Sequence, residues 1–240
     1  MEIASSSVLI TGASSGIGLS LTRQFLAKGA SVCAFSRRGL PNDVVEAHSN
    51  SLLNFIGDVS KSNDMKKCLE EIKKHFGKLS IVVANAGIAT FEHLWKTEDQ
   101  EAERMIQTNL LGVFHTVKQS YPLLQSTKGP RCVIGIHSIA ATTVFEGASV
   151  YSATKAGTLA MLRSFREEAR PDGISVLDVL PGATRTHIWT KDMLEERGED
   201  MMDPETIARI IIGALEEGRT SHDEITNVEE LVIRPWKGNL

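Results

Sequence analysis

The chain has 240 residues, of which 42% are hydrophobic and 23% are charged, and its formal net charge is -4. This length suits one domain with one hydrophobic core, and the acidic balance leaves no basic surface for nucleic acid or anionic lipid. No apolar run reaches the roughly 18 residues of a membrane-spanning helix, and no charged-then-apolar leader precedes Ser5. We therefore expect one cytoplasmic domain over residues 1–240, with neither nucleic acid nor membrane as a partner. The three cysteines lack metal-ligand spacing, so no metal is expected.

A glycine-rich turn lies near the N-terminus, between a predicted strand and a predicted helix. Residues 7–10 form an apolar run typical of a buried parallel strand, and residues 19–28 have helical spacing that ends at Gly29. Glycines allow close backbone approach, and the amides and dipole of a helix N-terminus attract a pyrophosphate. The turn therefore predicts a dinucleotide site made by Gly12, Ser14, Ser15, Gly16, Ile17 and Gly18.

The second predicted strand, residues 31–35, runs into Ser36, Arg37 and Arg38. After this strand of a nucleotide-binding fold, an acidic residue accepts a hydrogen bond from the ribose 2′-hydroxyl of NAD, whereas an arginine accommodates the 2′-phosphate of NADP. No carboxylate occupies the position here. The sequence favours NADP(H), although the two arginines could also be ordinary exposed loop cations.

The middle of the chain continues the alternation of strands and helices. Residues 52–59 predict a third strand, 63–76 an amphipathic helix, 79–84 a fourth strand and 98–124 a long helix. Asp58 or Ser60 could simply cap the helix that follows the third strand. Within the long helix, Asn109 predicts a local irregularity, because asparagine has low helix propensity and makes its own hydrogen bonds.

The fifth predicted strand, residues 132–138, leads into the segment that contains the candidate catalytic residues. Ser138 would emerge at the carboxyl end of the strand, where ligands bind in open α/β sheets. Alternation turns His137 to the opposite face, which favours a structural role for it. Tyr151 and Lys155 stand four residues apart at the start of a helix that extends to about residue 169, so they share one face. An ammonium beside the phenol would lower its pKa and make Tyr151 a general acid or base.

Two more predicted strands complete the pattern. Residues 175–180 predict the sixth strand, which ends at a Pro-Gly turn, and residues 230–234 predict the seventh. Between them, the segment 187–217 is expected to cover a bound substrate with its apolar side. The predicted fold is α/β: a single-domain Rossmann fold with a doubly wound, seven-stranded, mainly parallel sheet and helices on both faces.

Together these motifs resemble the short-chain dehydrogenase/reductase family over essentially the whole chain. The glycines have the family's Thr-Gly-x-x-x-Gly-x-Gly spacing, and Ser138, Tyr151 and Lys155 match its serine, tyrosine and lysine. The resemblance implies that Ser138 binds the substrate oxygen, that Tyr151 gives it a proton, and that Lys155 lowers the Tyr151 pKa and binds the ribose. It also implies that Asn109 completes a proton relay with Lys155.

The same resemblance implies further cofactor contacts. They are the adenine contacts Asp58 and Val59, the nicotinamide-ribose contacts Asn85, Ala86, Gly87, Tyr151 and Lys155, and the carboxamide contacts Pro181, Gly182, Thr184 and Thr186. Arg37 stands where NADP(H)-preferring members carry a basic residue, whereas Ser15 departs from a second basic position that some members have. Pairing through the helices that hold Asn109 and Tyr151 is also implied, as a homodimer or homotetramer.

The implied reaction is reversible, NADP(H)-dependent hydride transfer between a small ketone or aldehyde and its alcohol. The residues Ala140, Phe145, Ile188 and Trp189 indicate a partly apolar substrate, and the C-terminal part is similar to sepiapterin reductases and small hydroxy-acid dehydrogenases. Two alternatives stay open. One is a 3-oxoacyl-acyl-carrier-protein reductase of fatty-acid synthesis, and the other is a non-catalytic NADP(H)-sensing regulator, although such regulators typically lose the tyrosine or the lysine.

Overall fold

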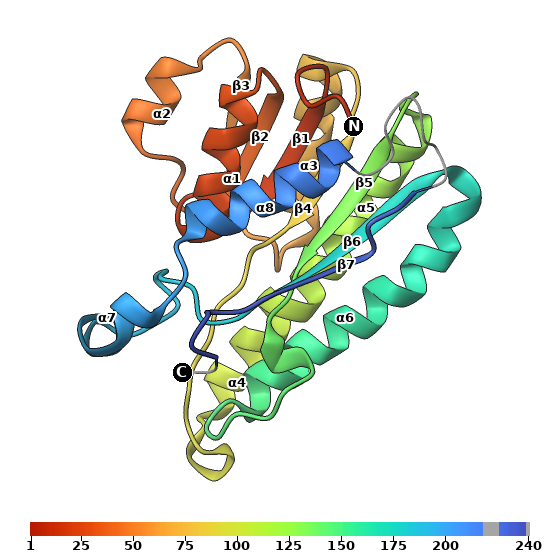
Figure 1. Ribbon diagram of the computed structural model, residues 1–240. Helices are drawn as coiled ribbons and strands as arrows, with labels where there is room; N and C mark the ends of the chain where they lie inside the picture. The colour runs from red at the N-terminus through yellow and green to blue at the C-terminus, as the bar shows by residue number, and fades with distance from the viewer. Residues whose placement is uncertain (218–225, 239–240) are drawn as a thin grey trace.

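The computed structural model describes residues 1–217 and 226–238. Asn239 and Leu240, the end of the C-terminal stretch compared above, lie outside the described residues. Within the described part, seven strands form one sheet in the order β3-β2-β1-β4-β5-β6-β7 (Figure 1). Every neighbouring pair is parallel, which confirms the predicted Rossmann-type sheet. The strands are β1 Ser7–Thr11, β2 Ser31–Ser36, β3 Leu52–Ile56, β4 Ile81–Ala84, β5 Arg131–Ile136, β6 Ile174–Pro181 and β7 Glu230–Ile233.

The order of the strands indicates where along the sheet a ligand would bind. From β1 the chain moves outward to β2 and β3, and then returns to pair β4 with the other side of β1. In doubly wound sheets a ligand binds outside the carboxyl ends of the strands at this reversal point. The loops after β1 and β4 therefore flank the expected site.

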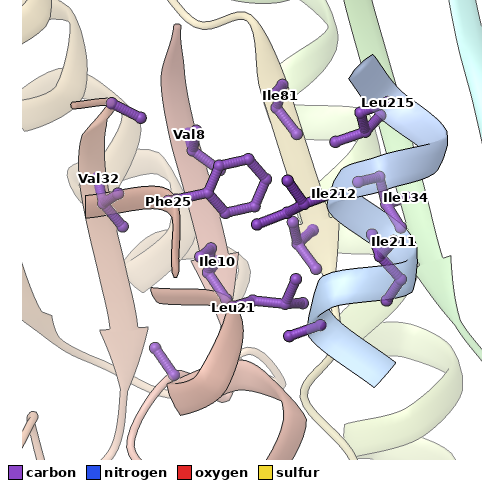
Figure 2. Packing of buried hydrophobic residues seen from close by; sticks show 14 of the residues in the cluster. Val8, Ile10, Leu21, Phe25, Val32, Ile81, Ile134, Ile211, Ile212 and Leu215 are labelled. Carbon is purple, nitrogen blue, oxygen red and sulfur yellow. The ribbon is translucent and has the colours of Figure 1, made fainter. Parts of the chain in front are cut away.

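Helices cover both faces of the sheet (Figure 1). They are α1 Gly16–Ala27, α2 Asn42–Ala47, α3 Ser62–Phe76, α4 Asp99–Met105, α5 Gly112–Ser126, α6 Ser149–Ala169, α7 Lys191–Arg197 and α8 Pro204–Glu217. Because strand side chains alternate, Val8 and Ile10 face a core made with α1 and α8, whereas Leu9 faces a core made with α3, α5 and α6. Figure 2 shows Phe25 of α1 and Ile212 of α8 packed over β1 and β4.

The long helix expected over residues 98–124 is interrupted. It begins as α4, widens into a π-helix over Ile106–Leu111 and continues as α5. Asn109 lies inside the π-helical turn, so the irregularity predicted there is confirmed. Such turns are rare in helices and often mark functional sites.

Most predicted element bounds differ from the observed ones by one to three residues, and the segment around β3 and the short helices differ most. β3 ends at Ile56 and not at residue 59, because Asp58 Oδ1 accepts hydrogen bonds from the Ser60 amide and hydroxyl and turns the chain. The N-cap of α3 is Lys61, so neither Asp58 nor Ser60 caps that helix. The short helices α2 and α7 were not predicted, since six or seven residues carry too little periodicity.

Only part of the segment 187–217 lies over the crevice. Ile207, Ile211 and Leu215 of α8 are buried in the core beside α1, so this helix supports the sheet and does not cover a substrate. The portion before residue 204 supplies the cleft residues described below. None of the described helices combines the length and apolar character needed to cross a membrane.

Candidate active site

A cleft of about 600 Å³ runs along the carboxyl ends of the strands. It brings together the following predicted site residues: Gly12, Ser14, Ser15, Gly16, Ile17, Ser36, Arg37, Arg38, Asp58, Val59, Asn85, Ala86, Gly87, Ser138, Tyr151, Lys155, Pro181, Gly182, Thr184 and Thr186. Gly18 and Asn109 do not line it. Both lie one layer behind the wall, and each supports residues that do line it.

The glycine turn after β1 has no room for side chains. Gly12 and Gly16 have φ angles of 68° and 54°, in the left-handed region that favours glycine. A Cβ on Gly18 would stand 2.3 Å from the carbonyl oxygen of Gly12, so this glycine permits close packing of helix and turn. The Asn85 amide donates to the carbonyl oxygens of Thr11 and Gly12 at 2.9 and 3.3 Å and holds the turn against the β4 loop.

This turn fits a dinucleotide pyrophosphate. α1 begins at Gly16, and its N-cap residue Ser15 makes no side-chain cap hydrogen bond. The N-terminal amides of a helix are donors without intrahelical partners, and the helix dipole favours an anion beside them. The bare backbone of the turn therefore matches the chemistry of a phosphate ligand.

Two cations stand at the far end of the cleft, after β2. Arg37 and Arg38 are exposed and line the cleft, and neither forms an ion pair with a described residue. Ser36 is buried, and its hydroxyl accepts a hydrogen bond from the Gly39 amide at 3.1 Å. Asp58 lies in the neighbouring loop after β3, where it also lines the cleft. This end of the cleft can hold the adenosine part of a nicotinamide cofactor, including a 2′-phosphate.

Ser138, Tyr151 and Lys155 meet near the middle of the cleft. Ser138 follows β5, where its hydroxyl accepts a hydrogen bond from the Ala140 amide at 3.1 Å, and it also hydrogen-bonds Tyr151. Tyr151 and Lys155 are both buried on α6. The Lys155 ammonium donates to the carbonyl oxygen of Ile136 at 2.9 Å and lies 5.8 Å from the centroid of the Tyr151 ring.

The predicted lowering of the Tyr151 pKa is wrong for this arrangement. Burial raises the pKa of Tyr151 to about 12, and only the hydrogen bond with Ser138 opposes the rise. Burial also lowers the pKa of Lys155 to about 8. The ammonium is directed at the Ile136 carbonyl and not at the phenol oxygen, so desolvation outweighs any attraction between the two side chains. Tyr151 is thus a protonated phenol at neutral pH.

Asn109 is fully buried behind the β4 loop. Its side-chain oxygen accepts from the Ile88 amide at 2.9 Å, and its amide donates to the Ile88 carbonyl and to the Thr154 hydroxyl at 2.9 and 3.0 Å. A Cβ on Gly87 would stand 3.4 Å from the Lys155 ammonium and 3.5 Å from the Asn109 oxygen. Asn109 therefore braces the loop beside the cleft and lies close to Lys155.

His137 is at the cleft wall, but both of its ring nitrogens contact buried partners, which agrees with the structural role predicted for it. Its Nδ1 lies 3.0 Å from the Thr158 hydroxyl and its Nε2 lies 2.8 Å from an Asp178 oxygen. Burial lowers the pKa of His137, whereas Asp178 opposes that change. Asp178 is itself fully buried and ion-paired with Arg166 of α6. This cluster joins β5, β6 and α6 close to Lys155.

The substrate end of the cleft contains residues that the sequence did not single out. Those lining it are Phe91, Arg104, Thr108, Glu146 and His187. The expected pocket residues Ala140, Phe145, Ile188 and Trp189 line it as well. Phe91 lies four residues after Gly87, a predicted cofactor contact, and this proximity was a usable signal. The other four residues lie on loops or helix faces, and the local sequence pattern does not predict that these face the cleft.

Comparison with known proteins agrees with this geometry. Residues 6–197 match the family model described as short chain dehydrogenase. The chain is 33% identical to "11-beta-hydroxysteroid dehydrogenase-like 3" of Arabidopsis thaliana, with 97% of this chain and 77% of the relative covered. It is 29% identical to a sepiapterin reductase of Chlorobaculum tepidum, with 97% of both chains covered.

Solved structures show the same fold. An alcohol dehydrogenase from Thermococcus sibiricus complexed with 5-hydroxy-NADP has a TM-score of 0.84, 25% identity and 98% coverage of both chains. A 3-ketoacyl-(acyl-carrier-protein) reductase from Brucella melitensis complexed with NADH has a TM-score of 0.85, 23% identity and coverage of 97% of this chain and 98% of the other. The Rossmann fold together with these matches places the protein among the oxidoreductases. More narrowly, the chain belongs to the short-chain dehydrogenase family, whose members bind a nicotinamide cofactor.

Proposed function

We propose that the protein is an NADP(H)-dependent carbonyl reductase that interconverts a ketone or aldehyde and its alcohol. The observation that carries this proposal is the convergence of Ser138, Tyr151 and Lys155 in one cleft with the glycine turn. Arg37 and Arg38 at the end of β2 support NADP(H), because a guanidinium without an ion-pair partner among the described residues suits a 2′-phosphate. Bound NADPH would supply the hydride.

The chain's own residues would manage the substrate oxygen and its proton. The Ser138 hydroxyl would hydrogen-bond the carbonyl oxygen, and Tyr151 would donate its proton as that oxygen becomes an alcohol. A pKa of about 12 keeps the phenol protonated and ready to donate at neutral pH. Lys155 would bind the ribose hydroxyls, and Asn109 beside it would take part in restoring the proton.

Cofactor choice is tested by fluorescence titration of NADPH and NADH against the wild type and Arg37→Ala. Charge-assisted hydrogen bonds contribute about 1.5–3 kcal/mol, so we expect NADPH to bind about 10- to 100-fold more weakly to the variant, with NADH binding unchanged. Arg209→Ala, on the exposed side of α8, is the matched control. Equal binding of the two cofactors by the wild type would contradict the assignment.

Turnover is tested separately from binding. A panel of ketones and aldehydes, with a 3-oxoacyl thioester included, should reveal reduction that disappears in Tyr151→Phe while NADPH binding persists. Strong preference for the thioester would favour the acyl-carrier-protein reductase. Tight NADPH binding with no turnover of any carbonyl compound would favour the regulator.

A further inference from the structure

Two aromatic side chains from opposite sides of the cleft stack on each other beside Tyr151. Phe91 belongs to the loop after β4 and Trp189 to the loop after β6. Their ring centroids are 5.0 Å apart and their planes differ by 16°. Phe91 also contacts the Tyr151 ring edge to face, with centroids 5.7 Å apart and planes at 66°. The aromatic pair, as we call Phe91 and Trp189, therefore joins the two walls of the cleft next to the proton donor.

The position of Trp189 is fixed by its own polar atom. The indole N–H donates to the carbonyl oxygen of Thr184 at 2.9 Å, which orients the ring plane while one face of the indole packs on Phe91. Thr184 is buried and bridges to Met202, so this anchor is part of the packed framework after β6. Because this hydrogen bond already restricts the indole side chain, a ligand ring that packs on it costs little further side-chain entropy, which favours binding.

The surroundings of the pair are apolar, and the charged groups nearby are directed into solvent. Ile88, Ala89, Phe145 and Ile188 pack against the buried side of Tyr151. Arg104 is ion-paired with Glu101, and the Glu146 side chain is 87% exposed. Among the described residues of this end, no buried charge other than Lys155 is available to hold a charged substrate group. A neutral substrate matches this lining.

We propose that the aromatic pair selects neutral ketones whose carbonyl carbon is bonded directly to a flat ring. This inference rests on the proposed reductase function and names its substrate class. Because the Phe91 and Tyr151 ring centroids lie 5.7 Å apart, a carbonyl compound bound at Ser138 and Tyr151 would hold its attached group near Phe91. Aromatic rings at centroid distances of about 4.5–7 Å attract each other beyond the effect of area burial, whereas a puckered ring cannot make that contact over its whole face.

The test compares two ketones with the same carbon skeleton. Acetophenone carries a flat ring, and cyclohexyl methyl ketone carries a puckered ring of the same carbon count. The ratio of kcat/KM for the flat to the puckered ketone is measured in the wild type, Phe91→Leu and Trp189→Leu. Comparing ratios between proteins cancels the difference in intrinsic reactivity of the two carbonyls. We expect each leucine variant to lower the ratio by about 3- to 10-fold.

Trp95→Phe is the control, because Trp95 is 78% exposed, stacks on His93 and does not line the cleft. It should leave the ratio unchanged. A ratio that stays at the wild-type value in both leucine variants would overturn the inference while the reductase function stands. Thermal unfolding of each variant shows whether it is folded. Because two variants are measured independently, the test still holds if one of them fails to fold.

A binding readout separates this inference from the reductase proposal. The chain has three tryptophans, so Trp95→Phe combined with Trp236→Phe leaves Trp189 as the only one. Tyr151→Phe is added to this protein to prevent turnover, and titration with 1-phenylethanol and with 1-cyclohexylethanol in the presence of NADP⁺ then monitors Trp189 emission directly. We expect the phenyl alcohol to change the emission at about 3- to 10-fold lower concentration. Equal concentrations for both alcohols would refute the aromatic selection, even if no ketone were reduced.

Discussion

Lys155 is buried, and burial of its ammonium group lowers the stability of the folded protein. Burial lowers its pKa to about 8 in the folded protein, below the value of about 10.4 in an unfolded chain. Below pH 8 both states carry the charge and the folded state bears the full desolvation penalty. As the pH rises from 8 toward 10.4, the folded state releases its proton first, so this penalty disappears and stability rises.

We therefore expect Lys155→Met to stabilise the protein at pH 7 by about 1–3 kcal/mol and to lose that advantage near pH 10. Urea unfolding at pH 7 and at pH 9.5 measures both values. Lys66→Met, on the exposed face of α3, serves as the control and should change little at either pH. A Lys155→Met variant less stable than the wild type at pH 7 would show that the hydrogen bond to Ile136 outweighs desolvation.

The π-helical turn is the element that places Asn109. The extra residue in this turn positions an asparagine amide against both backbone groups of Ile88, a residue of the loop after β4. Replacing Asn109 by alanine leaves the partly buried amide and carbonyl of Ile88 without these partners, and an unpaired group costs up to about 1–3 kcal/mol when it is buried. We expect Asn109→Ala to lower the thermal midpoint by several degrees and to lower kcat at least 10-fold. Ser120→Ala on the same helix system is the control, because the buried Ser120 hydroxyl has no hydrogen-bond partner.

The junction of β5, β6 and α6 depends on the buried carboxylate of Asp178. It accepts from His137 and pairs with Arg166, so its removal leaves His137 Nε2 without this acceptor and leaves Arg166 with its contacts to Glu229. Removing one partner of a buried ion pair costs about 3–5 kcal/mol, whereas an exposed pair contributes under about 1 kcal/mol. We expect Asp178→Ala to destabilise by that larger amount and Glu230→Gln, which breaks the exposed pair with Arg163, to have little effect. Chemical denaturation of the two variants makes the comparison, and similar values would contradict it.

At the scale of the whole molecule, the sequence predicted what local patterns encode. Apolar runs and the glycine turn predicted the sheet and the crevice, because both depend on residues close together in the chain. His137 contacts Asp178, and Phe91 contacts Trp189. These residues are far apart in sequence, so their spacing could not predict the contacts. The Tyr151 pKa was predicted in the wrong direction because it depends on where the Lys155 ammonium points, which only the packed structure reveals.

Association through the helices around Asn109 is a prediction for the whole molecule. Among the apolar residues of these helices, Val113, Leu159 and Leu162 are buried within the protein, whereas Phe114 is 40% exposed. Ile106, two turns earlier on the same helical run, is 42% exposed.

A charge placed at the centre of an apolar contact between copies would be buried without a partner. We expect the wild type to be dimeric or tetrameric in light scattering at micromolar concentration, and Phe114→Glu to weaken association at least 10-fold. Val144→Glu, at a loop position that is 97% exposed, should leave the mass unchanged. A wild type that is monomeric, or a Phe114→Glu variant with the wild-type mass, would exclude this face as the interface.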